Sequence, residues 1–545
     1  MRGTYHEVWR RVAAAVPDRP AVVSSRATLT YRDLDRDAAR LAGLLRERGV
    51  GAGDTVAIYS HNSVEYLTVV FAALTHGAAP VPLNFRYRAN EVQPLLEMVS
   101  AAALVYPRSL AEVVAAVRDA RPEMLLLEID DGASGSAGRD SAAGGPALSG
   151  AVPYTALESA AEHRPDPLPA DGDLLLCTGG TTGRPKAVVW SVAELFAGQQ
   201  YATYGTLGLP LPGTLDQAVQ IALDPATPRT VVLPLAPFMH GTALFNSMNV
   251  LLLGGTVVVL DSSRLDPDEA VRLARQEGVT RLIIAGDSVA RPVLDAAERA
   301  HPAGLPALTS VISSGMRLSD ESKARLHALG TVTVSDFLAS TEGGPYAVAV
   351  STGPQDLPAP LRLFPGAVVL DEHHAEIQDR PGAVGLLAFR GGLPTGYLGD
   401  PDRTAETFPV VGGRRHVVPG DWVQVLGDGE VELLGRGSAV VNSGGEKIYP
   451  AEVEEALMTH PDVTDAVVFG IPDERWGEAV TAVVAVVPGS SVTGADLAAH
   501  VGTRLAGYKK PRRVVLRDRL ERSPTGKIDL RALRAEVANL PGRPA

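Results

Sequence analysis

A stretch rich in glycine and threonine, TGGTTGRPK at residues 178–186, interrupts an otherwise apolar part of the sequence. Glycines allow backbone N–H groups to approach an anion closely, and threonine hydroxyls add further hydrogen-bond donors. A lysine at the end of the stretch adds a positive charge. The sequence therefore predicts a loop that holds phosphate groups. The residues expected to bind them are Thr178, Gly179, Gly180, Thr181, Thr182, Gly183 and Lys186.

This stretch differs from the P-loop of nucleoside triphosphatases. A P-loop requires Gly-Lys-Ser/Thr, whereas here Pro185 precedes Lys186 and Ala187 follows it. The P-loop interpretation therefore fails. Taken alone, the stretch is equally compatible with a tight turn that binds nothing, and its assignment depends on the rest of the chain.

The elements that would position the loop are predicted from its flanks. The apolar run Leu174–Cys177 predicts a buried strand. Ser191, followed three residues later by Glu194, predicts a capping box that opens the next helix. We therefore expect the segment between them to be a loop at the end of a strand, where α/β sheets usually bind ligands.

Two sequence patterns along the chain predict its architecture. Strand-like and helix-like segments alternate over residues 28–110, for example TVAIYS, SVEYLTVVFAALTHG and AAPVPLN, and this pattern is typical of a largely parallel sheet. Short strands and turns fill 364–434. We expect an α/β fold with a large N-terminal domain over 1–436, made of parallel α/β subdomains plus a β-rich subdomain. A small, mobile α+β domain is expected over 437–545.

The composition is that of a globular protein with two or more domains. The 545 residues are 45% hydrophobic and carry a net charge of −13, which argues against partners such as nucleic acid or an anionic membrane surface. The single cysteine, Cys177, excludes an intramolecular disulfide and a cysteine metal cluster. The first residues lack the apolar core of a signal peptide, and prolines interrupt the apolar stretch 231–260. A cytoplasmic enzyme is expected.

Four further stretches follow the phosphate loop in order. They are LASTEGG (338–344), PGDW (419–422), GRGSAVVNSGGEKIYPAEVE (435–454) and SPTGKIDLRAL (523–533). With the phosphate loop, they resemble the adenylate-forming superfamily of acyl-CoA synthetases, luciferases and peptide-synthetase adenylation domains. The resemblance extends from about residue 20 to 535. LAPFMHGTALF (235–245) and the 435–454 stretch are most similar to bacterial fatty-acyl and polycyclic-acid CoA ligases.

The resemblance implies how ATP is bound. The phosphate loop would hold the β- and γ-phosphates, Thr341 the α-phosphate, and Glu342 would orient Mg²⁺. Asp421 would accept hydrogen bonds from the ribose hydroxyls, assisted by Arg436. Gly315 would allow the adenine to approach closely.

The resemblance also implies a second half-reaction. Lys527 would bridge the carboxylate and the α-phosphate, and His240 would gate the route between the acid and the thiol. After adenylation the small domain would swing about Ser438, and Gly444 and Gly445 would leave room for a pantetheine arm. Coenzyme A is the expected acceptor, with a separate carrier protein as the alternative.

The residues expected around the acid are mostly small or apolar, which favours a hydrophobic carboxylic acid and leaves its linear or polycyclic nature open. They are His240, Ala243, Leu244, Ser314, Gly315 and Ala339.

Three alternatives remain open. Ala187 and Ala339 stand where the family usually has glycine. If either backbone needed a positive φ, alanine would cost roughly 1–2 kcal/mol. The result would be an enzyme that is impaired in adenylation and mainly thioesterifies a preformed acyl-adenylate. The preferred interpretation is that both positions tolerate alanine. A non-catalytic nucleotide- or acyl-binding homologue is the second alternative. An amino-acid adenylating enzyme, whose substrate amine Asp336 would bind, is the third.

Overall fold

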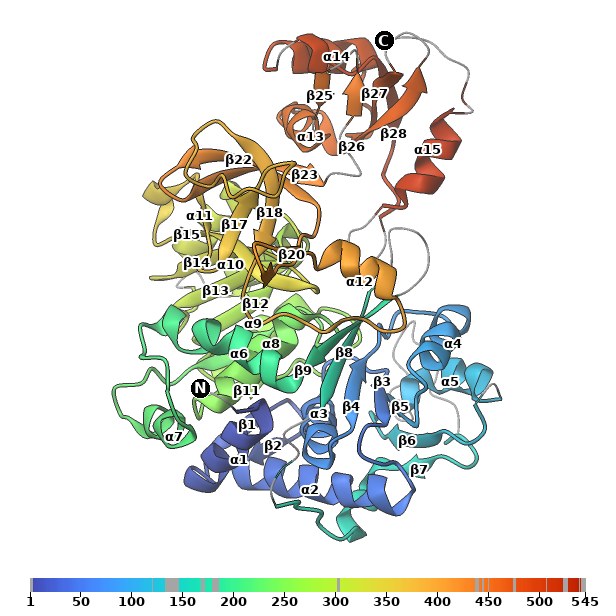
Figure 1. The fold of residues 1–545 in the computed structure, drawn as a ribbon, viewed down its shortest axis with the longest axis vertical. Helices are drawn as coiled ribbons and strands as arrows, with labels where there is room; N and C mark the ends of the chain where they lie inside the picture. The colour runs from blue at the N-terminus through green and yellow to red at the C-terminus, as the bar shows by residue number, and fades with distance from the viewer. Residues whose placement is uncertain are drawn as a thin grey trace. The chain divides into compact units, whose positions relative to one another are not determined.

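The computed structural model in Figure 1 describes most of the chain. The described residues are 3–119, 121–132, 147–166, 168, 172–178, 186–300, 304–436, 441–443, 446–448, 450–473, 477–505, 507–522, 528–538 and 540, with the backbone alone at 178, 436, 442, 446, 447, 477 and 508. They form two compact units. Unit 1 comprises Met1–Pro360, Phe364–Gly366 and Phe389–Val417, and unit 2 comprises Leu361–Leu363, Ala367–Ala388 and Val418–Ala545. The domain boundary at residue 436 stays a prediction.

The first sheet of unit 1 is parallel, in the order β4-β3-β5-β6-β7. Its strands are β3 (Thr55–Ile58), β4 (Ala79–Pro82), β5 (Ala103–Pro107), β6 (Leu125–Ile129) and β7 (Val152–Pro153). Helix α3 (Val64–His76) joins β3 to β4. It begins where Ser63 Oγ accepts a hydrogen bond from the Tyr66 N–H, and it ends at Gly77, whose φ of 81° suits glycine. The predicted βαβ pattern is confirmed.

A second sheet of unit 1 has the order β15-β14-β13-β12-β10-β11-β1-β2. Neighbours from β14 to β1 are parallel, whereas β15 and β2 are antiparallel to their partners. Its strands are β1 (Pro20–Val23), β2 (Thr28–Thr30), β10 (Val231–Pro234), β11 (Thr256–Val258), β12 (Arg281–Ile284), β13 (Ser310–Ser314), β14 (Thr333–Ser340) and β15 (Gly343–Ser351). Its central strands bury valine, leucine and isoleucine against helices, as parallel sheets require.

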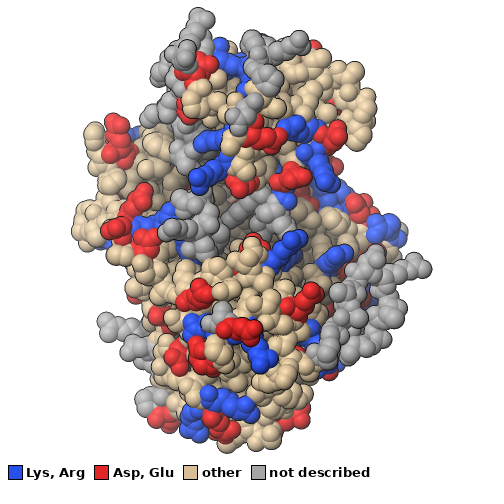
Figure 2. Space-filling view, turned by 90° about the vertical axis from the view of Figure 1, so that its right-hand side faces the viewer, with Lys and Arg blue, Asp and Glu red and all other residues tan. Residues whose placement is uncertain are grey.

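Helices of unit 1 cover both sheets, and α4 and α5 pack their apolar faces on the first one (Figure 1). The helices are α1 (Tyr5–Ala15), α2 (Tyr31–Glu47), α3, α4 (Ala89–Met98), α5 (Ala111–Arg118), α6 (Val192–Thr203), α7 (Leu215–Leu223), α8 (Gly241–Leu252), α9 (Pro267–Gln276), α10 (Asp287–Ala300), α11 (Asp320–Ala328) and α12 (Pro401–Thr407). None of the described helices is long and apolar enough to cross a membrane. Acidic and basic side chains are interspersed on the face drawn in Figure 2.

A small antiparallel sheet, β19-β9-β8, flanks the segment that was predicted to hold phosphate groups. Strand β8 (Asp173–Thr178) confirms the predicted buried strand. The chain then returns as strand β9 (Lys186–Ser191), and β19 (Gly396–Tyr397) pairs with β9. The expectation of one loop from strand to helix was therefore wrong, because residues 186–191 form a second strand. Residues 179–185 lie outside the described residues.

Ser191 caps helix α6, because its Oγ accepts a hydrogen bond from the Glu194 N–H at 3.2 Å. This is one half of the predicted capping box. The Glu194 side chain is exposed and lines a surface pocket.

Unit 2 contains two antiparallel groups of strands. The first has the order β17-β18-β22-β23-β16, and the second is β25-β24-β27-β26 with β28 parallel to β27. The strands are β16 (Leu361–Leu363), β17 (Ala367–Leu370), β18 (Val384–Phe389), β22 (Asp421–Gly427), β23 (Glu430–Arg436), β24 (Val441–Ser443), β25 (Glu446–Ile448), β26 (Val463–Asp473), β27 (Gly477–Val486) and β28 (Arg513–Arg517). Its helices are α13 (Pro450–Met458), α14 (Gly494–Gly502) and α15 (Leu530–Ala538). The structure confirms the predicted short strands over 364–434 and the predicted α+β fold of the last part of the chain.

The backbone at Ala187 and Ala339 resolves the question of strain. Ala187 lies inside β9, opposite Cys177, and is 1% exposed. Ala339 lies in β14 and is exposed. The described non-glycine residues with positive φ are Ser100, His374 and Asp428, so neither alanine is strained. The tolerance of alanine that the sequence analysis preferred agrees with this geometry.

Replacing Ala187 by glycine should therefore destabilise the protein. A glycine inside a strand costs roughly 0.5–1 kcal/mol, and loss of a buried methyl group adds about 0.8 kcal/mol. We expect the thermal midpoint to fall and the adenylation rate not to rise.

Ala339→Gly is the matched control, because it makes the same change at an exposed strand position and should cost less stability. A gain above tenfold in adenylation by Ala187→Gly would instead revive the strained-loop alternative.

Candidate active site

The STEGG sequence forms the turn between β14 and β15. Ser340 pairs with Gly343, so Thr341 and Glu342 lie at the tip of a two-residue hairpin turn. The Trp190 indole N–H donates to the Thr341 carbonyl oxygen at 3.1 Å. The turn is thereby tied to β9, the strand that begins with Lys186.

The following glycines are required by close packing. A Cβ atom at Gly343 would lie 2.7 Å from a methyl group of Val417, and Gly344 has a φ of 100°. Ser340 Oγ and Tyr346 Oη form a 2.8 Å hydrogen bond beside the turn. These contacts fix the backbone that carries Thr341 and Glu342.

Lys186, Tyr397 and Glu342 form the best-defined polar cluster of the site. The Tyr397 hydroxyl donates to Glu342 Oε1 at 2.7 Å, and the Lys186 Nζ lies 4.7 Å from the centroid of the tyrosine ring. Burial, and then the neighbouring carboxylate, raise the pKa of Tyr397, so its hydroxyl stays protonated and remains a donor. Hence one tyrosine contacts both the predicted phosphate-binding lysine and the predicted metal-binding carboxylate.

Strand pairing places Tyr397 at this position. Tyr397 pairs with Val188 of β9, and its N–H donates to Thr404 Oγ1 at 2.9 Å. Sequence reasoning missed this residue. A single Gly-Tyr pair in a glycine-rich segment carries no specific signal, because the pairing with a strand some two hundred residues earlier depends on the tertiary fold.

The predicted ribose-binding pair lies on one hairpin of unit 2. Asp421 begins β22 and is directly opposite Arg436, which ends β23. Gly420, which directly precedes Asp421, has a φ of 94°, a conformation that suits glycine. The spacing of fifteen residues thus corresponds to the two arms of a hairpin, and their roles toward ribose stay predictions.

The residues predicted to surround the acid come from three elements of unit 1. His240 is exposed at the N-terminus of α8, whereas Ala243 and Leu244 of that helix are 0% exposed and pack in the core. Ser314 ends β13, and the adjacent strand β14 carries Ala339.

Gly315 directly follows β13. It has a φ of 86°, and no heavy atom lies within 4 Å of the position that a Cβ atom would take. This open space is compatible with close approach of a ligand. Contact of these residues with an acid or with adenine stays a prediction.

Asp336 has a structural partner. The Lys323 Nζ lies 3.2 Å from Asp336 Oδ2, and the lysine side chain is 8% exposed. Burial raises the pKa of the Asp336 carboxyl, and the Lys323 ammonium lowers it. A substrate amine would have to displace a partly buried ion pair, which weighs against the amino-acid alternative.

Several predicted residues lie outside the described part of the chain, and their assignments stay predictions. They are Gly179, Gly180, Thr181, Thr182, Gly183, Ser438, Gly444, Gly445 and Lys527, together with the side chains of Thr178 and Arg436.

Solved structures support the fold over nearly the whole chain. The anthranilate CoA ligase AuaEII in complex with anthranoyl-AMP aligns with a TM-score of 0.77 at 19% identity, covering 99% of this chain and 98% of that one. ATP-bound MatB from Rhodopseudomonas palustris aligns with a TM-score of 0.74 at 24% identity, covering 99% and 100% of the two chains. At these identities the likeness concerns the fold alone.

Sequence relatives are more similar. A medium/long-chain-fatty-acid–CoA/3-oxocholest-4-en-26-oate–CoA ligase from Mycolicibacterium smegmatis is 38% identical over 95% of this chain and 93% of its own. A feruloyl-CoA synthase from Amycolatopsis sp. is 33% identical over 95% and 96%. Residues 9–398 match the AMP-binding enzyme family, and 452–527 match the AMP-binding enzyme C-terminal domain. The chain belongs to the AMP-binding enzyme family.

Proposed function

We propose that this protein is an acyl-CoA ligase. It joins a hydrophobic carboxylic acid to the α-phosphate of ATP, releasing pyrophosphate, and then transfers the acyl group from the adenylate to the thiol of coenzyme A, releasing AMP. The observation that carries this proposal is the cluster of Lys186, Tyr397 and Glu342 in a chain of the AMP-binding enzyme family. The full two-step reaction is preferred over impaired adenylation, because Ala187 and Ala339 have ordinary strand geometry.

The cluster suits the electrostatics of adenylation. A carboxylate that attacks a phosphate brings two anions together, so preorganised positive charge is the main catalytic resource. The Lys186 ammonium packs over the Tyr397 ring and is thereby held in the region of the 178–186 loop. We infer that it neutralises the phosphates of ATP, while Thr341 faces the α-phosphate and Lys527 bridges it to the acid.

Glu342 fits a role in holding Mg²⁺. The Tyr397 hydroxyl donates a hydrogen bond to Oε1 of Glu342 and thereby orients this carboxylate to bind a metal ion. Among the described residues no group of three or more His, Cys, Asp and Glu side chains could hold a metal ion. Mg²⁺ is commonly held by one or two carboxylates together with substrate phosphates and water, and here it would neutralise developing charge.

The acid is proposed to be hydrophobic, as the names of the relatives suggest for those proteins. The direct test is pyrophosphate release with medium- and long-chain fatty acids, 3-oxocholest-4-en-26-oate and ferulate, each with and without coenzyme A. Product analysis should give an acyl-CoA for at least one acid. Release of pyrophosphate without any thioester would contradict the second step and favour another acceptor, such as a carrier protein.

Domain alternation belongs to the same proposal. The segment 437–545 would act as the mobile domain, with Ser438 as its hinge and with Gly444 and Gly445 beside the pantetheine arm. His240 would gate the thiol channel. A cytoplasmic location, where ATP and coenzyme A are available, fits this chemistry.

Tyr397→Phe tests the positioning role of the tyrosine hydroxyl. The change removes one hydrogen bond to a carboxylate, worth about 1.5–3 kcal/mol, and leaves the ring beneath Lys186. We expect adenylation to slow by roughly 10- to 100-fold, with a higher Mg²⁺ concentration needed for half-maximal rate.

Tyr106→Phe is the matched control, because its hydroxyl also donates to a carboxylate, that of Glu128 at 3.2 Å, but in the first sheet of unit 1. It should leave the magnesium dependence unchanged. A Tyr397→Phe enzyme with the wild-type rate and magnesium dependence would refute the positioning role.

Asp421→Ala should raise the KM for ATP more than the KM for the acid. The lost charge-assisted contact with ribose corresponds to about 1.5–3 kcal/mol. Asp379→Ala removes the same charge from an exposed position of unit 2 and serves as the control. Steady-state kinetics with each substrate varied would measure the difference, and unchanged ATP kinetics would exclude the ribose assignment.

Lys527→Ala should block adenylation and spare thioester formation from a supplied acyl-adenylate. Loss of one preorganised donor costs about 2.7–4 kcal/mol, or some 10²–10³ in rate. Lys510→Ala, at an exposed lysine of the same unit, should affect neither half-reaction. An equal loss of both half-reactions in Lys527→Ala would mean that Lys527 is structural.

A further inference from the structure

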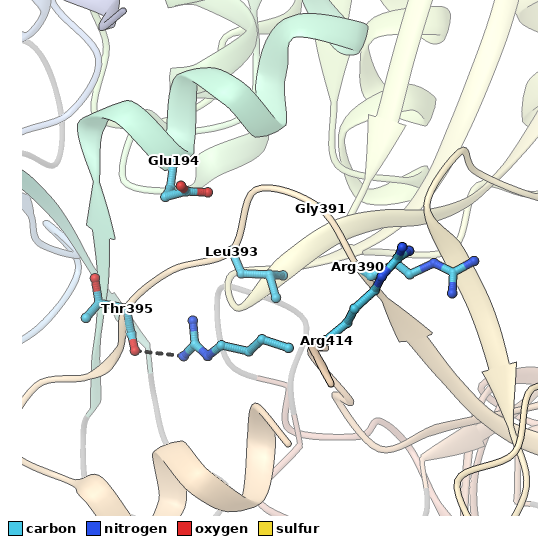
Figure 3. A pocket seen from close by; sticks show the side chains of 7 residues that line it. Glu194, Arg390, Gly391, Leu393, Thr395 and Arg414 are labelled. Carbon is cyan, nitrogen blue, oxygen red and sulfur yellow. Dashed lines mark hydrogen bonds between the residues drawn. The ribbon is translucent and has the colours of Figure 1, made fainter. Parts of the chain in front are cut away.

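A surface pocket of about 720 Å³ lies in unit 1, and none of its lining residues was predicted from the sequence to bind a ligand. Figure 3 shows that its side chains come from three segments: the start of α6, the segment 390–395 that leads into β19, and strand β21 (Arg414–Arg415). The lining residues are Glu194, Arg390, Gly391, Leu393, Thr395, Arg414 and Arg415. The volume falls in the range typical of small-molecule sites.

A tight hairpin presents two of the arginines. Strand β20 (Val410–Val411) pairs with β21, and the turn between them is Gly412-Gly413, with φ values of 56° and 75°. Positive φ at both turn residues is the geometry of a two-residue hairpin turn, which glycine adopts readily. Arg414 and Arg415 follow immediately, so their backbone position is fixed by the turn.

Arg415 forms a wall of the pocket. Its Nη1 donates to the Pro394 carbonyl at 2.6 Å and its Nη2 to the Thr395 carbonyl at 2.7 Å, a contact drawn in Figure 3. Its guanidinium carbon lies 4.6 Å from the centroid of the Phe408 ring. This arginine therefore holds the 394–395 backbone and contributes charge from a fixed position.

The segment 391–395, which supplies three of the lining residues, is held against α6 by a close backbone contact. A Cβ atom at Gly392 would lie 2.4 Å from the Glu194 carbonyl oxygen and 2.6 Å from the Gly198 nitrogen. Only glycine permits this approach of the 391–395 segment to α6. The pocket is thus built from constrained backbone on two sides, and a ligand would meet a preformed site.

The charge of the pocket is opposite in sign to that of the chain. Three arginines and one glutamate line it, in a protein of net charge −13. Burial lowers the pKa of the Arg415 guanidinium, and the Glu194 carboxylate raises it. An anion would compensate this partial desolvation, and guanidinium groups match phosphate oxygens in planar, paired hydrogen bonds.

We propose that this pocket binds a small molecule carrying a phosphate group, with Arg414 as the principal phosphate contact. Arg414 is exposed on the hairpin and reaches the pocket without supporting its walls. The phosphate could belong to free inorganic phosphate or to the 3′-phosphate of coenzyme A. Both share the same chemistry; binding of the free anion is independent of the proposed function, whereas binding of coenzyme A rests on it.

The experiment is an equilibrium titration of the full-length protein by calorimetry, and comparison with a variant of Arg414 separates this pocket from the nucleotide site. The probes are inorganic phosphate, coenzyme A and dephospho-coenzyme A. The variants are Arg414→Gln and, as a matched control, Arg48→Gln, an exposed arginine at the end of α2. Thermal midpoints would establish that both variants fold.

Arg414→Gln should weaken the binding of at least one phosphate-bearing probe tenfold or more, whereas Arg48→Gln should bind all probes as the wild type does. Weaker binding of coenzyme A but not of dephospho-coenzyme A would identify the 3′-phosphate as the group that the pocket binds. Weaker binding of inorganic phosphate alone would identify the free anion as the ligand. Equally weaker binding of coenzyme A and dephospho-coenzyme A would identify the diphosphate that both carry. Unchanged binding of every probe would overturn the proposal.

Discussion

The pairing of the two-residue strand β19 with β9 is the constraint on which the described part of the site depends. It brings Tyr397 beside Lys186 and within hydrogen-bond distance of Glu342. The lysine, the tyrosine and the carboxylate are far apart in the sequence, and this pairing is what brings them together in space. A short strand is weak alone, and here it is reinforced by the Arg415 contacts to residues 394–395 and by the Thr395 N–H, which donates to the Val189 carbonyl at 2.7 Å.

The arginine-lined pocket and the cluster of Tyr397 and Glu342 therefore share one segment of the chain. Residues 391–397 pass the arginine-lined pocket and then reach the cluster of Tyr397 and Glu342. The close contact of Gly392 with α6 and the strand pairing of Tyr397 fix the two ends of this segment. A rigid connection of this kind suits a site that must hold charge in place before the substrates arrive.

Local patterns in the sequence predicted much of the fold. Helix α3 has its cap at Ser63 and its glycine stop at Gly77, and the apolar run of β8 is buried as expected. Such features depend on neighbours in the sequence, so periodicity and capping chemistry report them.

Other features depended on contacts between distant residues. The return of the chain as β9 was missed because an apolar segment before a helix cap fits either a loop or a strand. Tyr397 was missed because its role arises from pairing with Val188. Asp336 was suspected of binding a substrate amine, whereas its partner Lys323 comes from a helix that the sequence could not orient.

The β8–β9 hairpin has a consequence for the loop that it carries. Thr178 and Lys186 are paired residues of the two strands, so folding brings the ends of segment 179–185 together before any anion binds. The entropy of closing a loop grows with the logarithm of its length, and here the hairpin rather than the ligand supplies that closure. A phosphate bound as proposed would therefore meet Lys186 on a strand that is already paired on both sides, so little of its binding free energy would be lost to ordering that residue.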